Sequence, residues 1–327
     1  MGKTTKYTFL LPAYKGRFLD DMLQSIQCQT YRDFKVIISD DCSPENLYSI
    51  CEPYLKDSRF TYRRNETNMG KEDLIAHWNL LVDLCETDYL IMTSDDDRYS
   101  SRFLEDAESL AIKYPNVDLI RAKVRNIDKD GKVCREEKPS PEFVDQLHFL
   151  EQMFCKEYCP CIANFIFKTK PFQENGGFIK FPLAMGSDDA TTLLMSANGV
   201  ANIQTTTFDF RLSGINISYH KEESVEIKLK KIEAANMFCD WMEKFLKSIP
   251  VGTPQNKELL SQINKGIDFY LYCCTSSYIF GLDYGNFIKE YKFILQHHLF
   301  PNRKIMLKVY LKWWKNFVKR FYKKRIL

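Results

Sequence analysis

Short apolar runs alternate with amphipathic segments over the first two-thirds of the chain. Residues 7–11 (YTFLL), 34–39 (FKVIIS) and 89–93 (YLIMT) are the clearest runs, and each has the length of a buried strand. Between them, residues 18–29 and 72–84 place apolar side chains at helical spacing. Strands that alternate with helices in this way predict an α/β fold with a parallel, doubly wound sheet.

Polar or turn residues follow each of these three strands. The first run is followed by PAY at residues 12–14, the second ends in SDDCS at 39–43, and the third leads into SDDD at 94–97. Proline cannot donate to a sheet ladder, so we expect the first strand to stop at Pro12. The carboxyl ends of parallel strands meet at one edge of a sheet, where open α/β sheets bind ligands. The sequence therefore predicts that these three segments form one site.

The third segment carries three consecutive acids, Asp95, Asp96 and Asp97. Adjacent carboxylates repel one another and are tolerated best where a cation neutralises them. Oxygen ligands of this kind suit Mg²⁺ or Mn²⁺, which commonly also bind oxygens of a substrate phosphate. The alternative interpretation is a solvated acidic turn that caps the following helix.

A second acidic pair lies later in the chain, within GSDDATTLLMSANG at residues 186–199. Asp188 and Asp189 begin a predicted helix, where the helix dipole favours carboxylates. They are either functional acids or simple helix-capping residues. A Thr-rich predicted strand follows and ends at Arg211.

The pattern changes from residue 220 onward, where all clear periodicity is helical. We therefore expect a first domain at residues 1–219 and a helical region at residues 220–327. From residue 301 to the end there are ten Lys or Arg residues and no Asp or Glu. Within residues 308–324, Trp and Phe oppose a lysine-rich side, a pattern typical of a helix that lies on an anionic membrane. The alternative is a helix packed on the protein with solvated lysines; no nucleic-acid-binding signature is present.

Composition adds only a few limits. Hydrophobic residues make up 45% of the chain and charged residues 27%, which is ordinary for a globular protein. Eleven cysteines without regular spacing, and no leader-like segment, favour a reduced cytoplasmic setting. No apolar run reaches the roughly 18 residues of a membrane span.

The order of the motifs resembles that of family-2 glycosyltransferases over residues 5–220. PAY, SDDCS, NMGK at residues 68–71, SDDD, GGF at 176–178 and the late acidic pair follow one another as they do in that family. The resemblance implies a GT-A fold, a Rossmann-like, mostly parallel sheet flanked by helices. It also implies an inverting enzyme that uses a nucleotide sugar and a divalent cation, Mn²⁺ or Mg²⁺.

The resemblance further implies a nucleotide-binding set at the ends of the first strands and in the loop beneath the nucleotide. Its members are Pro12, Ala13, Tyr14, Asp40, Asp41, Asn68, Gly70, Lys71, Asp95 and Arg211. Asp95 would hold the ribose, and Asp96, together with Asp97, would meet the metal. Ser94 departs from the common D-x-D-D pattern, which leaves open which acid ligates the ion. Arg211 would lie near the diphosphate, or it is a surface or salt-bridged arginine.

The late pair matches the family's Glu-Asp pair, with Asp188 in place of Glu and Asp189 as the catalytic base. An acceptor hydroxyl that attacks C1 must lose its proton to such a base. A cation stabilises the leaving diphosphate, and inversion in one step needs no enzyme nucleophile. We therefore expect sugar transfer from a UDP-sugar donor to a glycan or lipid-linked acceptor, in the style of bacterial surface-polysaccharide or lipopolysaccharide enzymes. The expected location is the cytoplasm, with peripheral contact of residues 301–327 with the inner face of the membrane.

Two other functions fit part of the pattern. One is an inactive nucleotide-sugar-binding partner subunit, which the intact acids disfavour. The other is a sugar nucleotidyltransferase, which would require a glycine- and arginine-rich phosphate loop near the first strand. The PAYKGR segment is a poor match to such a loop.

Overall fold

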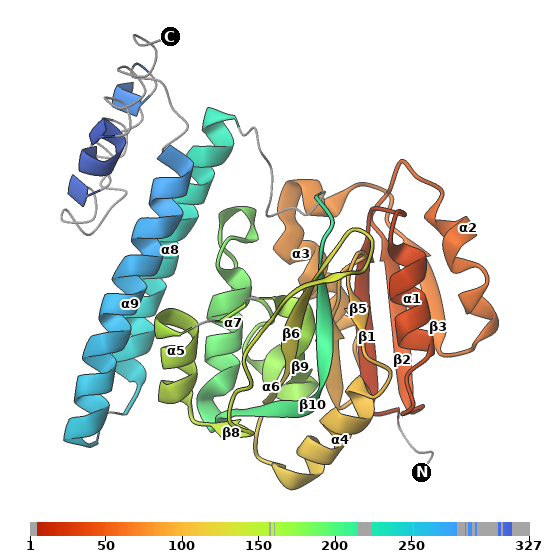
Figure 1. Ribbon diagram of the computed structural model, residues 1–327. Coiled ribbons are helices and arrows are strands. Elements are labelled where there is room, and N and C mark those ends of the chain that lie inside the picture. Colours follow the sequence, from red (N-terminus) through yellow and green to blue (C-terminus); the bar gives the residue numbers. More distant parts are fainter. Residues whose placement is uncertain are drawn as a thin grey trace. The chain divides into compact units, whose positions relative to one another are not determined.

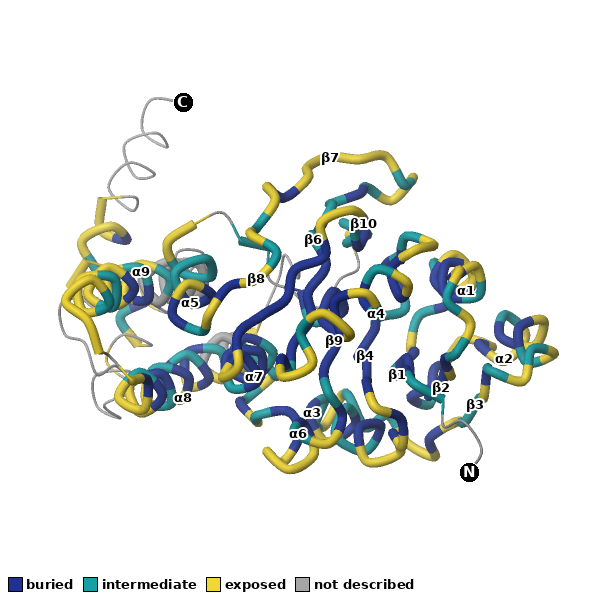
Figure 2. Tube along the Cα trace, turned by 90° about the horizontal axis from the view of Figure 1, so that it is seen from below, coloured by how far each residue is buried: buried dark blue, intermediate teal, exposed yellow. Residues whose placement is uncertain are grey.

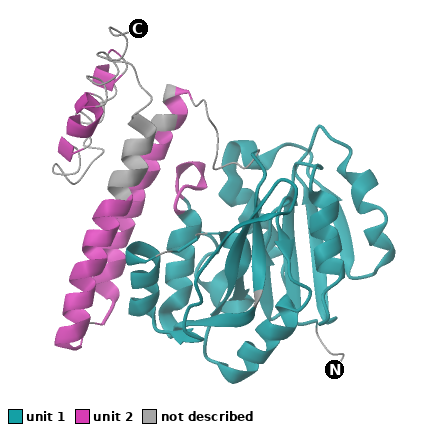
Figure 3. Ribbon diagram, viewed as in Figure 1, with its two compact units in different colours: residues 1–180, 187–220 teal, residues 181–186, 221–327 magenta. Residues whose placement is uncertain are grey.

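The computed structural model describes residues 5–156, 158–159, 161–214, 224–250, 252–279, 285, 287–289, 292, 307–308 and 310–315. The chain divides into two compact units (Figure 3). The first contains residues 1–180 and 187–220, and the second contains residues 181–186 and 221–327. The short segment 181–186 therefore groups with the C-terminal helices.

The first unit is built on one mixed sheet with the strand order β3-β2-β1-β4-β9-β6-β10-β5 (Figure 1). Strands β1, β2, β3 and β4 pair in parallel, as do β6 and β10, whereas β9 and β5 pair antiparallel to their neighbours. Two short strands lie off this path, β7 on β6 and β8 on β10. The strands are β1 Tyr7–Ala13, β2 Phe34–Asp40, β3 Phe60–Arg64, β4 Tyr89–Met92, β5 Arg98–Tyr99, β6 Leu119–Asp128, β7 Val133–Glu136, β8 Phe143–Val144, β9 Phe165–Lys168 and β10 Val200–Leu212. The predicted α/β class and mostly parallel sheet are confirmed.

Helices cover both faces of this sheet (Figure 2). One face is covered by α1, α2 and α4, whose apolar side chains join alternate residues of β1 in one hydrophobic core cluster. The other face carries α3 and α6, and α5 packs on α7. The helices of this unit are α1 Leu19–Gln27, α2 Leu47–Cys51, α3 Met69–Asp83, α4 Phe103–Lys113, α5 Gln146–Cys155, α6 Thr169–Glu174 and α7 Ser187–Met195, with short 3-10 turns at Tyr54–Lys56, Ile162–Asn164 and Ser196–Asn198.

The expectation that β1 stops at Pro12 is wrong, because the strand continues to Ala13. Pairing with β4 ends at Leu10, opposite Met92, whereas pairing with β2 continues to Ala13, opposite Asp40. The Ala13 carbonyl accepts a hydrogen bond from the N–H of Asp41 on the β2 side. Backbone groups alternate along a strand, so the nitrogen of Pro12 faces the β4 side, where no ladder partner is needed.

The second unit is helical, which confirms the predicted C-terminal region. It contains the 3-10 turn η3 Pro182–Ala184 and the long helices α8 Val225–Ser248 and α9 Pro254–Ile279. No helix in the described parts of the chain is both long and apolar enough to cross a membrane. The predicted tail helix at residues 308–324 is described only in part, because residue 309 and residues 316–324 lie outside the described residues.

Candidate functional site

The loop after β1 and the acidic turn after β4 are joined through Asp95. Its Oδ2 accepts hydrogen bonds from the backbone N–H groups of Tyr14 (2.8 Å) and Lys15 (2.7 Å). Burial raises the pKa of Asp95 to about 6, although these two donors oppose the shift. The first and third predicted strand ends therefore meet, as the motif order implied.

Asp96 and Asp97 are both buried in the same turn. Asp96 Oδ2 accepts a hydrogen bond from Ser213 Oγ at 3.0 Å. Asp97 Oδ1 accepts the backbone N–H of Arg211 at 2.8 Å, and its Oδ2 accepts the hydroxyl of Ser94. Burial raises the pKa of Asp96, and burial together with the negative charge of Asp96 raises the pKa of Asp97 to about 8. Without an added positive charge, the turn resists full ionisation of its carboxylates.

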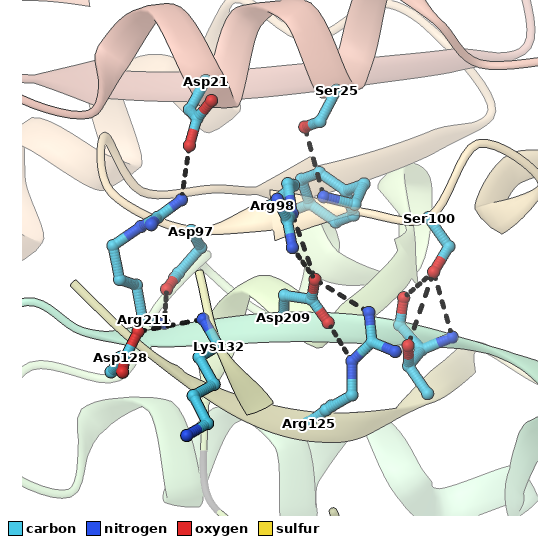
Figure 4. A network of polar contacts seen from close by, with 12 residues as sticks. Asp21, Ser25, Asp97, Arg98, Ser100, Arg125, Asp128, Lys132, Asp209 and Arg211 are labelled. Atoms are coloured by element: carbon cyan, nitrogen blue, oxygen red, sulfur yellow. Dashed lines mark hydrogen bonds and ion pairs between the residues drawn. The ribbon is translucent and has the colours of Figure 1, made fainter. Parts of the chain in front are cut away.

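Arg211 ties this acidic turn to α1 (Figure 4). Its guanidinium donates from Nε to the backbone carbonyl of Asp96 (2.8 Å) and from Nη2 to Asp21 Oδ2 (2.7 Å). The guanidinium also lies over the ring of Phe18, 4.5 Å from its centroid, and the residue is only 2% exposed. Arg211 is therefore salt-bridged to Asp21 and hydrogen-bonded to the backbone of the acidic turn.

The second strand end presents Asp40 and Asp41 beside the loop after β1. Asp40 is fully buried and accepts hydrogen bonds from Ser43 N (2.8 Å), the Tyr62 hydroxyl (2.6 Å) and the Arg64 guanidinium. Its charge is therefore matched by a cation on the neighbouring strand β3.

Asp41 binds the backbone at the start of α3. Its two carboxylate oxygens accept the backbone N–H groups of Met69 (2.9 Å) and Gly70 (2.7 Å). A Cβ on Gly70 would lie 2.9 Å from Asp41 Oδ2, so a larger residue would displace the Asp41 carboxylate. Asn68 caps the same helix by accepting the N–H of Lys71 at 2.8 Å. The NMGK segment is thereby fixed beside the end of β2.

The late acidic pair opens α7, as predicted. Asp188 Oδ1 accepts the N–H of Asp189 at 3.0 Å, Asp189 is 9% exposed, and burial raises the pKa of Asp188. The pKa of the buried Cys161 thiol is raised by the charges of both this pair and the acidic turn. Burial raises the Cys161 pKa most, and the charges of Asp97 and, less strongly, Asp188 raise it further. Cys161 therefore lies within electrostatic reach of both acidic groups.

The glycine-rich GGF segment is anchored to α3. Asn79 accepts the N–H of Phe178 at 2.7 Å and donates to its carbonyl at 3.3 Å. Gly177 has a φ of +78°, and a Cβ there would lie 2.5 Å from Asn79 Oδ1. Both facts require glycine at this position.

Several residues of the site carry no signal in the sequence. The N–H of Lys15 belongs to the backbone, so no residue type marks it. Ser213 and Asp21 are common surface types that become site residues only through the approach of β10 and α1 to the turn. Asn65 and His77, which lie against Asp41, fall inside a loop and a helix pattern that explain them without any site.

The carboxylates of the acidic turn are oxygen ligands of the kind that Mg²⁺ and Mn²⁺ prefer. No group of three or more His, Cys, Asp or Glu side chains among the described residues is arranged to hold a metal ion. Mg²⁺ and Mn²⁺ are, however, commonly bound by one or two carboxylates together with substrate phosphates. The buried, mutually repelling carboxylates of the acidic turn fit an ion shared with a substrate in this way.

Comparison with known proteins places this geometry in a family. Residues 8–175 match the family described as Glycosyl transferase family 2. The chain belongs to this family. Over 156 residues it is 26% identical to an uncharacterized glycosyltransferase of Methanocaldococcus jannaschii, covering 47% of this chain and 52% of that protein. It is 22% identical over 129 residues to the poly(ribitol-phosphate) beta-N-acetylglucosaminyltransferase TarS of Staphylococcus aureus, covering 38% of this chain and 22% of that protein. The matched parts thus span about half or less of these curated relatives.

Solved structures support the GT-A-like fold of this family-2 member. Residues 1–349 of S. aureus TarS, solved in complex with UDP-GlcNAc, have a TM-score of 0.62 at 14% identity, covering 96% of this chain and 92% of that chain. The mannosyltransferase PcManGT of Pyrobaculum calidifontis, solved with GDP-Man and Mn²⁺, has a TM-score of 0.52 at 15% identity, covering 84% and 72%. At these identities the likeness concerns the fold.

Proposed function

We propose that this family-2 protein is an inverting glycosyltransferase that moves a sugar from a nucleotide-sugar donor to an acceptor hydroxyl. The observation that carries the proposal is the junction at Asp95, where the loop after β1 donates two backbone N–H groups to the acidic turn after β4. Together with the pairing of β1 with β2 and the contacts of Asp41 with Met69 and Gly70, this junction gathers the segments at residues 12–14, 40–41, 68–71 and 95–97 at one edge of the sheet. Ligands bind at this edge in open α/β sheets.

The donor is proposed to be a UDP-sugar. Residues 12–14 and the acids Asp40 and Asp41 would hold the base and ribose, with Asp95 on the ribose and the 68–71 turn beneath the nucleotide. The complexes of TarS with UDP-GlcNAc and of PcManGT with GDP-Man support a nucleotide-sugar donor in general. Among the nucleotides, UDP is favoured because the resemblance to family-2 enzymes implies it.

A divalent cation, Mn²⁺ or Mg²⁺, is proposed to bind at Asp96, with Asp97 beside it. Both carboxylates are buried, and the negative charge of Asp96 raises the pKa of Asp97. A cation bound at the turn would offset this repulsion. When bound, the ion supplies positive charge for the diphosphate leaving group.

Asp189 is proposed to be the general base. As the acceptor oxygen attacks C1 of the sugar, the bond from C1 to the diphosphate breaks and the hydroxyl proton passes to the Asp189 carboxylate. Attack opposite the leaving group inverts the anomeric centre. Asp188, whose carboxylate accepts the N–H of Asp189, would orient the start of α7.

The acceptor is proposed to be a glycan or a lipid-linked saccharide of a surface-polysaccharide pathway.

Tail residues described in the second unit support contact with an anionic membrane. Leu307, Leu311 and Trp314 recur at helical spacing and are 56%, 55% and 44% exposed. Trp313, expected on the membrane side, is instead buried and stacks on Phe287 with ring centroids 3.7 Å apart. The apolar stripe and the surrounding lysines would suit the inner face of the cytoplasmic membrane.

Membrane contact is tested by flotation with anionic vesicles of phosphatidylglycerol and phosphatidylcholine. Full-length protein should float with the vesicles, and removal of residues 301–327 should abolish this. A triple change Leu307→Glu, Leu311→Glu and Trp314→Glu should do the same while leaving donor turnover unchanged. Equal flotation of all three proteins would refute the membrane proposal.

The catalytic proposal is tested by thermal stabilisation with UDP, GDP, dTDP and CDP, each with Mn²⁺, Mg²⁺ or chelator. A ligand that binds only the native state raises the melting temperature with its saturation. Stabilisation by one nucleotide only in the presence of metal would support both the donor class and the acidic-turn role. Asp189→Asn should keep this stabilisation and lose turnover by about 100-fold or more.

The released product separates the competing functions. A glycosyltransferase releases a nucleoside diphosphate, a nucleotidyltransferase releases pyrophosphate, and an inactive partner subunit releases neither. Nucleotide binding without any release would favour the partner-subunit alternative.

A further inference from the structure

Buried polar residues that the proposed mechanism does not use enclose the carboxylate of Asp41. Asn65 Nδ2 donates to Asp41 Oδ1 at 2.8 Å, and His77 Nδ1 lies 3.6 Å from Asp41 Oδ2. Asn65 Nδ2 also lies 3.3 Å from His77 Nε2, which closes a ring of three side chains. Asp41, Asn65 and His77 are 5%, 7% and 1% exposed. We call these three residues the Asp41 ring.

The contacts of the Asp41 ring fix its hydrogen positions. The Asn65 amide nitrogen donates to a carboxylate, so the group that it turns toward His77 is also a donor. His77 Nε2 must therefore accept, and Ser39 Oγ, 3.1 Å from the same nitrogen, can donate to it as well. The imidazole proton is left on Nδ1, which faces Asp41. A charged imidazole would carry a hydrogen on Nε2 that points at the N–H of the Asn65 amide. Burial and the charge of Arg63 also lower the pKa of His77, although Asp41 opposes this shift. Both effects favour the neutral ring.

The Asp41 ring determines where the first turn of α3 lies. At Asp73 the helix is broken (φ −153°, ψ 93°), so residues 69–72 form a separate turn. Asp73 caps the longer helical piece through Ala76 N at 3.1 Å. The separate turn is fixed to the sheet through the Asp41 carboxylate, which accepts both Met69 N and Gly70 N. A shift of this carboxylate must therefore shift the turn.

We propose that His77 and Asn65 are positioning residues for the nucleoside diphosphate part of the donor. They contact the Asp41 carboxylate and so fix its position. The carboxylate in turn fixes the turn at residues 68–71, beside which the nucleotide would bind. This inference rests on the proposed function, since it assigns a role within the same donor site. No such role is proposed for His148, the other histidine among the described residues, which is an exposed helix residue paired with Asp145.

The test compares His77→Gln with the matched control His148→Gln. We measure the dissociation constant of whichever of UDP, GDP, dTDP and CDP binds best, by calorimetry with Mn²⁺, well below the melting temperatures. His77→Gln should weaken binding by about tenfold, which corresponds to one positioning contact. Turnover at saturating donor should stay within about twofold, so that KM moves and kcat does not. His148→Gln should match wild type in both. A merely structural role would lower the melting temperature of His77→Gln and leave the dissociation constant unchanged.

A second measurement uses the wild-type protein, in case His77→Gln does not fold. Nitrogen-15 NMR of the histidine rings should show one ring with its proton on Nδ1 and an unprotonated Nε2, and this ring should shift when the nucleotide binds. An Nε2-protonated ring at His77, or a ring insensitive to nucleotide, would overturn the inference. Equal dissociation constants for wild type and His77→Gln would overturn it while leaving the proposed function standing. Failure of the wild type to bind any nucleotide would instead overturn the proposed function, and the inference with it.

Discussion

The two acidic groups on the sheet edge are built in opposite ways. The acids after β2 are supplied with donors by the fold itself, because Arg64 contacts Asp40 and backbone N–H groups and Asn65 contact Asp41. The acids after β4 repel one another in a buried turn, and their pKa values are raised. The first group therefore serves as a scaffold that is complete without ligand. The second carries a charge conflict that a bound cation would relieve.

The largest effect expected from this comparison is on catalysis. Asp96→Asn keeps the shape of the side chain and a partner for Ser213 but removes the proposed metal ligand, so turnover should fall on the order of 1,000-fold. The melting temperature should not fall, because the change removes a repelling charge. Nucleoside diphosphate release measures the first and calorimetry the second. Asp130→Asn, at an exposed turn, is the control. Near-normal turnover of Asp96→Asn would refute the metal assignment.

Asp41→Ala, unlike Asp96→Asn, should lower the stability of the protein. The change leaves two backbone N–H groups and the Asn65 amide without their acceptor, and we expect a loss of about 3 kcal/mol in the free energy of unfolding. Urea denaturation measures this, with Asp130→Ala as the exposed control. If Asp41→Ala and Asp130→Ala were equally stable, the scaffold interpretation of the β2 acids would be wrong.

The charge conflict after β4 should also make cation binding depend on pH. Ligating carboxylates must lose their protons, and the pKa of Asp97 is about 8 in the cation-free protein. Affinity for Mn²⁺ in the presence of nucleotide should therefore rise by roughly 100-fold from pH 6 to pH 8.5. Calorimetry at these two pH values tests the prediction. An affinity that does not change with pH would show that the turn is already fully ionised.

The smallest expected effect concerns His77, on the β2 side of the site. Stability, like the cation affinity above, should increase with pH, but the cause is the protonation of a histidine. The pKa of His77 in the folded protein lies below its ordinary value of 6.5. Between these two pKa values His77 is protonated in the unfolded chain and neutral in the folded protein. This contribution to stability is present above pH 6.5 and is lost as the pH falls from 6.5 toward the folded pKa, by at most about 1.4 kcal/mol per pH unit. The slope of unfolding free energy against pH should be shallower for His77→Gln than for wild type between pH 5 and 6.5. Equal slopes would mean that His77 is charged in the folded state.

The sequence was informative where a local pattern determines the structure. Apolar runs followed by acids located the ends of β2 and β4, and helical spacing located α1, α3 and the C-terminal helices. It was uninformative where a partner comes from a distant segment. The two-residue strand β5 exists only because β10 lies beside it, and the contacts of Arg211 depend on the approach of α1 and the acidic turn. The hydrogen-bonding state of His77 likewise depends on Asn65, which is brought near by the fold.

The proline inside β1 has a consequence for how the edge of the sheet stays open. A residue with a free N–H at position 12 could extend the ladder toward the chain that leaves β4, and the two strands would close along their whole length. Pro12 prevents such closure on that side while β2 still holds the strand on the other. The chain after Met92 can then turn across the end of β1, and the next free donors, at Tyr14 and Lys15, meet Asp95. The proline thus acts as a spacer between two strands, and that spacing leaves room for the acidic turn to lie across the end of β1.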